Sequence, residues 1–520
     1  MAEIELWNCC TEGNVDKVLD LLTLDTININ QGDEEWNRTP FYRACGHGQL
    51  EIVKILMRDK RVEVNKPNLN EATPFFIACQ ENKKEVIEWM LKDERVDVKK
   101  QNNNRLDPFY VVCQKGYVEL AEMMLRSGKF EINSLNKNDE TPLYIACDKG
   151  HVEIVKLLLQ EKTIKVNMLT TLGKTPLYIA CRRNGLENVK LLLSMEEIDP
   201  NQVGSDEITP LFIACENGYQ DIVKVLLNDQ RVNVNKARNL GATPFLIACE
   251  TGKDELVKLL LTDKRIDINQ ARNDSVTPLF MACQNNHYKV VKHILKDERI
   301  EVDLSQTDDV SPFWVACQEG HLEIVKFMLK DKRININKAD IYGVTPLFMA
   351  AQEGHLEVVK WILANSIDVD IEAKYQNTTN ANEQARKEGH FEISDLLSAY
   401  ETRRDEIVFL LRNQLKILGI FILKLIFTFE IKIELNNQID KIAAIYFVFI
   451  VGFTDGYYRF QNENIDPKLI QFFQIIVKLP QELQMIVCLR ILGLRKDIIP
   501  LKMIHKCLRK ETYKNPLEKL

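Results

Sequence analysis

The stretch "TPLYIACDKG" at residues 141–150, followed by "HVEIVKLLLQ" at 151–160, decides the fold of this chain of 520 residues. It sets one cysteine, Cys147, in an apolar run between a Thr-Pro pair and a glycine. The block returns every 34 residues, so nine of the thirteen cysteines lie on one lattice, at Cys45, Cys79, Cys113, Cys147, Cys181, Cys215, Cys249, Cys283 and Cys317. A fixed period of this length indicates a stacked array of small units rather than several compact domains.

Each unit carries signals for the start and the end of a helix. Before the apolar run stands Thr-Pro in eight units, and Asp107-Pro108 and Ser311-Pro312 in two others. Thr, Asp and Ser can each accept a hydrogen bond from the first free N–H groups of a helix, and Pro loses nothing at the first helical position. A Gly or an Asn follows each run, and these residues readily adopt the left-handed conformation that ends a helix. We therefore predict two short helices per unit, followed by a turn and a polar loop tip.

Helices this short are marginal alone and must bury their apolar faces against the next unit. The residues "TPLYIAC" (141–147), "TPLFIAC" (209–215) and "GHVEIVKLLL" (150–159) resemble ankyrin repeats, whose signature contains Thr-Pro-Leu and an Ala at these spacings. A period of 34 also suits tetratricopeptide repeats, but their Trp-x-x-Leu-Gly pattern does not occur here. The resemblance implies an all-α fold, an ankyrin-type α-solenoid of stacked helix pairs with finger loops.

The repeat pattern also sets the expected domain boundaries. We predict a solenoid over residues 1–400, with an N-terminal cap over about 4–36, ten full repeats over about 37–376 and a C-terminal cap over about 377–400. After residue 400 the 34-residue pattern stops. We predict a small, mainly helical C-terminal module over 401–520.

The lattice cysteines are interpreted as core residues. Packed helices lie about 8–10 Å apart, too far for disulfides between units, and one thiol per unit cannot build a tetrahedral metal site. Cys occupies a column in which the ankyrin family commonly has Ala, and Ala351 fills it in the tenth full repeat. The residue two after each Pro is aromatic in nine repeats. This aromatic column is either a ladder within the core or a stripe offered to a ligand.

Charged residues at the loop tips and at the ends of the first helices are the candidate binding site. Two residues before each Thr the ankyrin family prefers Gly, and only Gly173, Gly241 and Gly343 follow that preference. In the family, tips and first helices line the concave surface that holds a partner protein. The resemblance therefore implies a partner site drawn from Trp36, Glu71, Arg105, Asp139, Asp148, Arg182, Arg183, Glu207, Glu216, Glu250, Asp309 and Glu319. The alternative is that each of these residues is only solvated.

A second charged pattern lies in the turn after the second helix. Asp-x-Arg recurs there six times, at Asp59/Arg61, Asp93/Arg95, Asp229/Arg231, Asp263/Arg265, Asp297/Arg299 and Asp331/Arg333. A row of arginines could bind anions. Exposed Asp–Arg pairs within each turn are the alternative, worth roughly 0–1 kcal/mol each.

Composition and motifs point away from several functions. Residues 1–400 carry 49 Lys+Arg and 62 Asp+Glu, and this acidic balance argues against nucleic acid as the main ligand. We find no catalytic or metal-ligand spacing and no phosphate-binding loop, and we expect no enzyme activity, cofactor or metal. No apolar run reaches the twenty residues of a membrane span. We expect a monomer, or a scaffold within a complex, located in the cytoplasm or, alternatively, the nucleus.

The C-terminal region suggests a second function. The segment "KLPQELQMIVCLRIL" (478–492) is similar to the Leu-Pro-x-Glu-Leu opening of F-box domains. The resemblance implies that Leu479, Pro480, Glu482 and Leu483 dock a ubiquitin-ligase linker protein while the repeats select a substrate. The same string is also a common helix start, with Pro in the first turn and Glu near the positive end of the helix dipole. The basic tail over 495–520 is either a solvated helix face or a contact for an acidic partner or a membrane surface.

Overall fold

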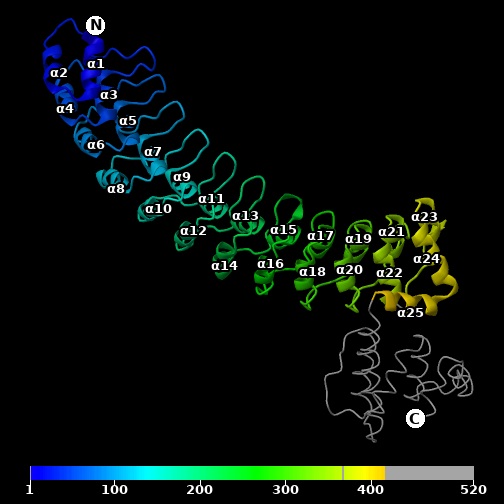
Figure 1. Cartoon of the computed structure of the whole chain (residues 1–520). Helices are drawn as coiled ribbons and strands as arrows, with labels where there is room; N and C mark the ends of the chain where they lie inside the picture. Colours follow the sequence, from blue (N-terminus) through cyan, green and yellow to red (C-terminus); the bar gives the residue numbers. More distant parts are fainter. Residues whose placement is uncertain (1, 366–367, 377, 416–520) are drawn as a thin grey trace, which may run out of the picture. The chain divides into compact units, whose positions relative to one another are not determined.

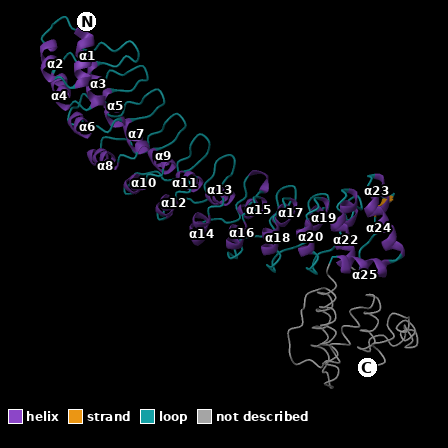
Figure 2. Ribbon diagram, viewed as in Figure 1, coloured by secondary structure: helices purple, strands orange, loops and turns teal. Residues whose placement is uncertain are grey.

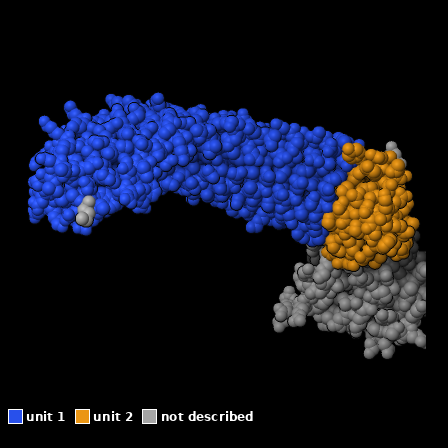
Figure 3. All heavy atoms as spheres, turned by 90° about the horizontal axis from the view of Figure 1, so that it is seen from above, with its two compact units in different colours: residues 1–341 blue, residues 342–520 orange. Residues whose placement is uncertain are grey.

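The computed structural model describes residues 2–365, 368–376 and 378–415 (Figure 1). The chain divides into two compact units, residues 1–341 and residues 342–520 (Figure 3). Helices make up most of the described elements, as Figure 2 shows. Unit 1 holds the N-terminal cap and nine full repeats, and each unit is described separately below.

Unit 1 begins with the cap helices α1 (Ala2–Glu12) and α2 (Val15–Leu22). The first helices of its repeats are α3 (Pro40–His47), α5 (Pro74–Gln80), α7 (Pro108–Lys115), α9 (Pro142–Lys149), α11 (Pro176–Arg182), α13 (Pro210–Asn217), α15 (Pro244–Glu250), α17 (Pro278–Gln284) and α19 (Pro312–Gln318). The second helices are α4 (Leu50–Arg58), α6 (Lys84–Met90), α8 (Val118–Ser127), α10 (Val152–Leu159), α12 (Leu186–Leu193), α14 (Gln220–Asn228), α16 (Asp254–Leu260), α18 (Tyr288–Ile294) and α20 (Leu322–Met328). A 3₁₀ turn, η1 (Asn239–Gly241), lies in one finger loop.

The predicted helix starts are confirmed. The side chain of the residue before each Pro accepts a hydrogen bond from the backbone N–H three positions on, as Thr141 does from Tyr144 at 3.0 Å. Asp107 and Ser311 make the same bond at 2.7 and 3.1 Å, so the departures from Thr preserve the cap. The residues predicted to end the first helices also adopt the left-handed conformation, with Gly150 at a φ of 77° and Asn82 at 55°.

Stacking of equivalent helices builds the core of unit 1. Each first helix packs on the first helix of the next repeat, and second helices pack on one another in the same order in most neighbouring repeats, as α10 does on α12. The nine lattice cysteines are free and buried in this core, and burial raises the pKa of the Cys147 thiol. Their interpretation as small core residues is confirmed.

The aromatic column is buried as well, with Phe212 at 0% and Tyr144 at 8% exposure, so the core-ladder interpretation of that column is confirmed.

The Asp-x-Arg turns connect neighbouring repeats. In each of the six, the Arg pairs with its own Asp at 2.6–2.8 Å. The guanidinium also donates to a backbone carbonyl at the end of the preceding second helix, as Arg265 does to Leu227 at 2.6 Å. Such carbonyls have no partner inside their own helix. The turn-pair interpretation is confirmed, and the arginines additionally cap the helix of the repeat before them.

An asparagine ladder runs beside these arginines. The Asn235 side chain donates to the Arg265 carbonyl at 2.7 Å and accepts from the Asp267 N–H at 2.9 Å, both in the next repeat. Asn65, Asn133, Asn167, Asn201 and Asn269 repeat this pair of bonds. The turn edge of unit 1 is therefore fixed by residues that recur with the period.

Unit 2 begins with the helices α21 (Pro346–Gln352) and α22 (Leu356–Asn365). The two-residue strands β1 (Lys374–Tyr375) and β2 (Thr379–Asn380) pair antiparallel, with Lys374 opposite Asn380. Three helices follow, namely α23 (Ala381–Lys387), α24 (Phe391–Thr402) and α25 (Arg404–Gln414).

The predicted C-terminal cap lies in α23 and α24, and α25 packs on α22 and α24. Leu479, Pro480, Glu482 and Leu483 lie outside the described residues. No helix in the described ranges is long and apolar enough to cross a membrane.

Candidate protein-binding surface

The finger loops of unit 1 project to one side of the stack, beside the first helices (Figure 1). We call the finger tips together with the C-terminal ends of these first helices the finger face. The turn edge, by contrast, consists of the Asp-x-Arg turns and the asparagine ladder. The candidate residues predicted from the sequence all belong to the finger face.

Every finger has a residue in the left-handed conformation at the same position. These residues stand two before the capping residue, and φ lies between 55° and 85° at Asn37, Glu71, Arg105, Asp139, Gly173, Glu207, Gly241, Ser275, Asp309 and Gly343. Gly adopts this conformation without penalty, whereas a residue with a Cβ pays roughly 1–2 kcal/mol. Asn and Asp are better tolerated there than Glu or Arg. Glu71, Arg105 and Glu207 therefore occupy positions for which the backbone would favour Gly.

Neighbouring finger tips are joined through their backbones, as by the hydrogen bond from the Asn103 N–H to the Asn70 carbonyl at 3.0 Å, whereas their charged side chains are exposed. Glu71, Arg105, Glu207 and Asp309 are exposed, and Trp36 is 40% exposed beside Asn37. Arg105 reaches Asp139 of the next finger at 3.9 Å, and Lys100 reaches Glu71 at 3.4 Å. Exposed pairs at these distances stabilise the fold little. The side chains at the tips are therefore available to a partner.

The ends of the first helices carry the other candidates. Arg183 donates to Asp148 of the preceding repeat at 2.8 Å, so the structure brings these two residues together across repeats. Arg182 is exposed, and Glu216 and Glu250 hold the same column one and two repeats further along. Glu319 is also exposed. The remaining candidates lie in rows one repeat apart and do not form a single cluster.

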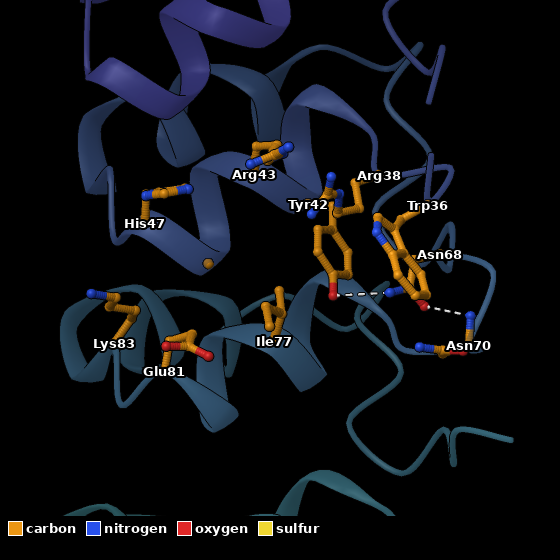
Figure 4. Close-up of a pocket in the computed structure, with 11 residues that line it drawn as sticks. Trp36, Arg38, Tyr42, Arg43, His47, Asn68, Asn70, Ile77, Glu81 and Lys83 are labelled. Carbon is orange, nitrogen blue, oxygen red and sulfur yellow. Dashed lines mark hydrogen bonds between the residues drawn. The ribbon is translucent and has the colours of Figure 1, made fainter. Parts of the chain in front are cut away.

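One hollow lies at the N-terminal end of the finger face. It has a volume of about 440 Å³, and its walls include Trp36, Tyr42, Ile77 and several charged side chains. Figure 4 shows Trp36 and Tyr42 along one side and His47 and Lys83 along the other. Asn68 supports the aromatic side because its amide donates to the Tyr42 hydroxyl at 3.2 Å. Of these residues only Trp36 was among the candidates predicted from the sequence.

Cationic residues dominate the charges of this hollow. Arg38, Arg43 and Lys83 line it together with the single acidic residue Glu81. Partial burial, followed by the charges of Arg43 and Lys83, lowers the pKa of His47. Sequence reading missed these residues because it looked for what recurs in every repeat, whereas they depart from the repeat pattern.

The described residues contain no group of three or more His, Cys, Asp or Glu placed to hold a metal ion. The described cysteines are buried and free, and burial raises the pKa of the lattice thiols. A thiol with a raised pKa is a poor nucleophile, because the thiolate is the reactive form. The finger face therefore offers charged and aromatic contacts as its surface chemistry.

A comparison with models of known protein families finds a match for these repeats. A family model described as ankyrin repeats (3 copies) matches in seven overlapping windows that together run from residue 6 to residue 374. A search among curated proteins returned no match. The matched windows extend over more than half of the chain and coincide with the helix pairs described above. The chain belongs to the ankyrin-repeat family.

Proposed function

We propose that unit 1 binds a partner protein through the finger face. Ankyrin repeats indicate a protein–protein interaction domain, and the family is a non-enzymatic interaction module. The finger turns are the observation that favours the finger face over the turn edge as the binding surface. The nine finger turns of unit 1 share one left-handed conformation, yet their side chains range from Gly to Glu and Arg. Residues whose backbone conformation costs free energy, and whose side chains add little to stability, are expected at functional positions.

Charge reversal at Glu216 and Glu250 tests this proposal. Both side chains lie at the ends of first helices and only partly buried, so Glu216→Lys with Glu250→Lys should leave the fold intact. Bound to a resin, the intact wild-type chain captures proteins from a cytosolic extract, and their identities and amounts are measured by mass spectrometry. We expect the double variant to lose about tenfold of at least one captured protein, because interfacial charges select partners.

The matched control places the same reversal on the second helices, as Asp221→Lys with Glu255→Lys. Both residues are exposed on α14 and α16, away from the finger face. This variant should retain the captured protein at the wild-type level. Equal capture by both variants would place the binding site elsewhere.

A role as substrate adaptor of a ubiquitin ligase is the second candidate. It is supported by the string "LPQEL" at 479–483, through which Leu479, Pro480, Glu482 and Leu483 would dock the ligase linker protein. Substituting Leu479→Ala and Leu483→Ala in the full chain should abolish recovery of that linker protein. Failure of the wild-type chain to recover it would exclude the adaptor role and leave partner binding by the repeats unaffected.

We also propose an oligomeric state and a cellular location for the chain. The chain acts as a monomer or as a scaffold within a complex, without nucleic acid, in the cytoplasm or nucleus. The free thiols of the described residues support this, because reducing compartments keep cysteines unpaired. Fractionation of cells, with the chain detected by an antibody, tests the location.

A further inference from the structure

The hollow at the N-terminal end of the finger face departs from the repeat pattern at several positions. Arg43 holds a column that is apolar in every other full repeat, at Ile77, Val111, Ile145, Ile179, Ile213, Ile247, Met281, Val315 and Met349. Trp36 holds a column with no other tryptophan. The helix pair needs neither residue to form, because nine other repeats fold without them.

Gly46 is the third departure, and it creates space. The equivalent residues are Gln80, Gln114, Asp148, Arg182, Glu216, Glu250, Gln284, Gln318 and Gln352, all with long or charged side chains. Gly46 lies inside α3 at an ordinary helical φ, where Gly costs roughly 0.5–1 kcal/mol relative to Ala. The chain accepts that cost at the one repeat where a side chain would extend toward the hollow.

Of the three cations that line the hollow, the two arginines are paired with carboxylates of the protein. Asp33 accepts from Arg38 at 2.6 Å and from Arg43 at 3.4 Å, and Glu35 accepts from Arg38 at 3.4 Å. Within the described residues the Nε of Arg43 is buried and has no hydrogen-bond partner, because the guanidinium is held by Trp7 and Asp33 instead. Lys83 extends along Gly48 on the opposite side, and no ion pair of Lys83 occurs in the part of the chain that the structure describes. Lys83 therefore has its ammonium group available for an acceptor supplied from outside.

Arg43 is also held in place from behind. Its guanidinium lies 4.3 Å from the centre of the Trp7 ring in the N-terminal cap, and the Trp7 indole donates to the Arg38 carbonyl at 2.9 Å. These contacts restrict the arginine before any ligand arrives, which lowers the entropic cost of binding. The contacts with Trp7 explain how Arg43 is placed but leave the glycine at position 46 and the exposed Trp36 unexplained.

Resting on the proposed function, we propose that this hollow receives an acidic side chain of the partner protein. The Asp or Glu carboxylate accepts hydrogen bonds from Arg43 and Lys83, and an apolar neighbour on the same extended segment packs on Trp36. Charge complementarity selects this occupant, because Arg38, Arg43 and Lys83 line the hollow with the single acidic residue Glu81.

A phage-displayed random peptide library selected on the intact chain tests the proposal. Selected peptides should be enriched in Asp and Glu next to an apolar residue. Their Kd, measured by fluorescence polarisation with a fluorescein label, should rise about tenfold for Lys83→Gln, because one charge-assisted hydrogen bond is lost. Lys253→Gln is the matched control, since Lys253 holds the same column as Lys83 five repeats along, and its Kd should stay at the wild-type value.

The variant Gly46→Gln should block the hollow without destabilising the fold, so a change in its Kd reports on binding. It installs the residue that five other repeats carry at this column, does not touch Trp7, and requires Ile77 to move by only a few tenths of an ångström. It should also raise the Kd about tenfold or more by filling the hollow. Peptides without acidic enrichment, or with equal affinity for Gly46→Gln, would overturn the proposal. If peptides that fail these two criteria bind the double variant Glu216→Lys with Glu250→Lys more weakly than wild type, the finger face still binds protein. Recovery of no peptide at all would count against both the hollow and the finger face as binding sites.

Discussion

The turn edge and the finger face of unit 1 are built on the same 34-residue period but differ in what they keep constant. At the turn edge both backbone and side chains recur, because Arg265 and its equivalents donate to the preceding repeat. At the finger face the backbone recurs, with a left-handed residue at the same position in every finger, but the side chains do not. A constant backbone with varied side chains is expected where the fold fixes the position of each residue and a binding partner determines which residue type stands there. The comparison predicts that the turn edge governs stability and the finger face governs binding.

The largest effect on stability is expected from Arg265→Ala. The change removes the hydrogen bond to the Leu227 carbonyl and the pair with Asp263, both partly buried. We expect the free energy of unfolding, measured by urea denaturation, to fall by about 1–3 kcal/mol, the range for hydrogen bonds to charged groups. The exposed neighbour in the same turn supplies the control, and Lys264→Ala should stay within about 0.5 kcal/mol of wild type. Equal losses for the two variants would mean that the arginine contributes only its surface charge.

Asp303→Asn should stabilise the chain by about 1 kcal/mol at neutral pH. Asp303 holds the column of the asparagine ladder: one carboxylate oxygen accepts from the Asn335 N–H at 2.9 Å, while the other is buried without a partner. At the equivalent site Asn269 donates to the Arg299 carbonyl, which an ionised carboxylate cannot do. The substitution should restore that hydrogen bond, and thermal unfolding of the two proteins measures the gain.

The same aspartate predicts a pH dependence. Burial raises the pKa of Asp303 above its usual range, although the Asn335 N–H and Lys338 oppose the shift. A carboxyl with a raised pKa in the folded state favours the protonated form, so folding gains stability as pH falls through that raised value. The stability difference between Asp303→Asn and wild type should therefore be largest at neutral pH and shrink on acidification. A difference that stays constant with pH would exclude Asp303 as its source.

Glu207→Gly at the finger face should have the smallest effect on stability, and of the opposite sign from Arg265→Ala. The left-handed conformation at a φ of 55° costs Glu roughly 1 kcal/mol more than Gly, partly offset by the greater freedom of Gly in the unfolded chain. We expect a gain of about 0.5 kcal/mol in urea denaturation. Gly241→Glu, the reverse change one repeat along, should destabilise by a similar or larger amount. A loss of stability with Glu207→Gly would show that the Glu side chain supports the fold.

Much of the architecture follows from the sequence because it depends on local rules that recur ten times. Thr-Pro caps, glycine or asparagine helix ends and the burial of Cys147 each follow from the residue types and their spacing. The bond from Arg265 to Leu227 joins residues 38 positions apart and appears only when the stack is built. The hollow around Gly46 was missed for a different reason. Arg43 and Gly46 differ from their columns, and only the structure shows that Arg43 and Lys83, forty residues apart, line one space.

A single variant tests most directly whether the finger face serves recognition rather than folding. It replaces Glu71, Arg105, Asp139, Glu207 and Asp309 together with Gly, and its affinity for a protein captured by the wild-type chain is measured by biolayer interferometry. We expect an unfolding free energy equal to or above the wild-type value and binding weakened about tenfold or more. Undiminished binding by this folded variant would show that the finger side chains do not serve recognition.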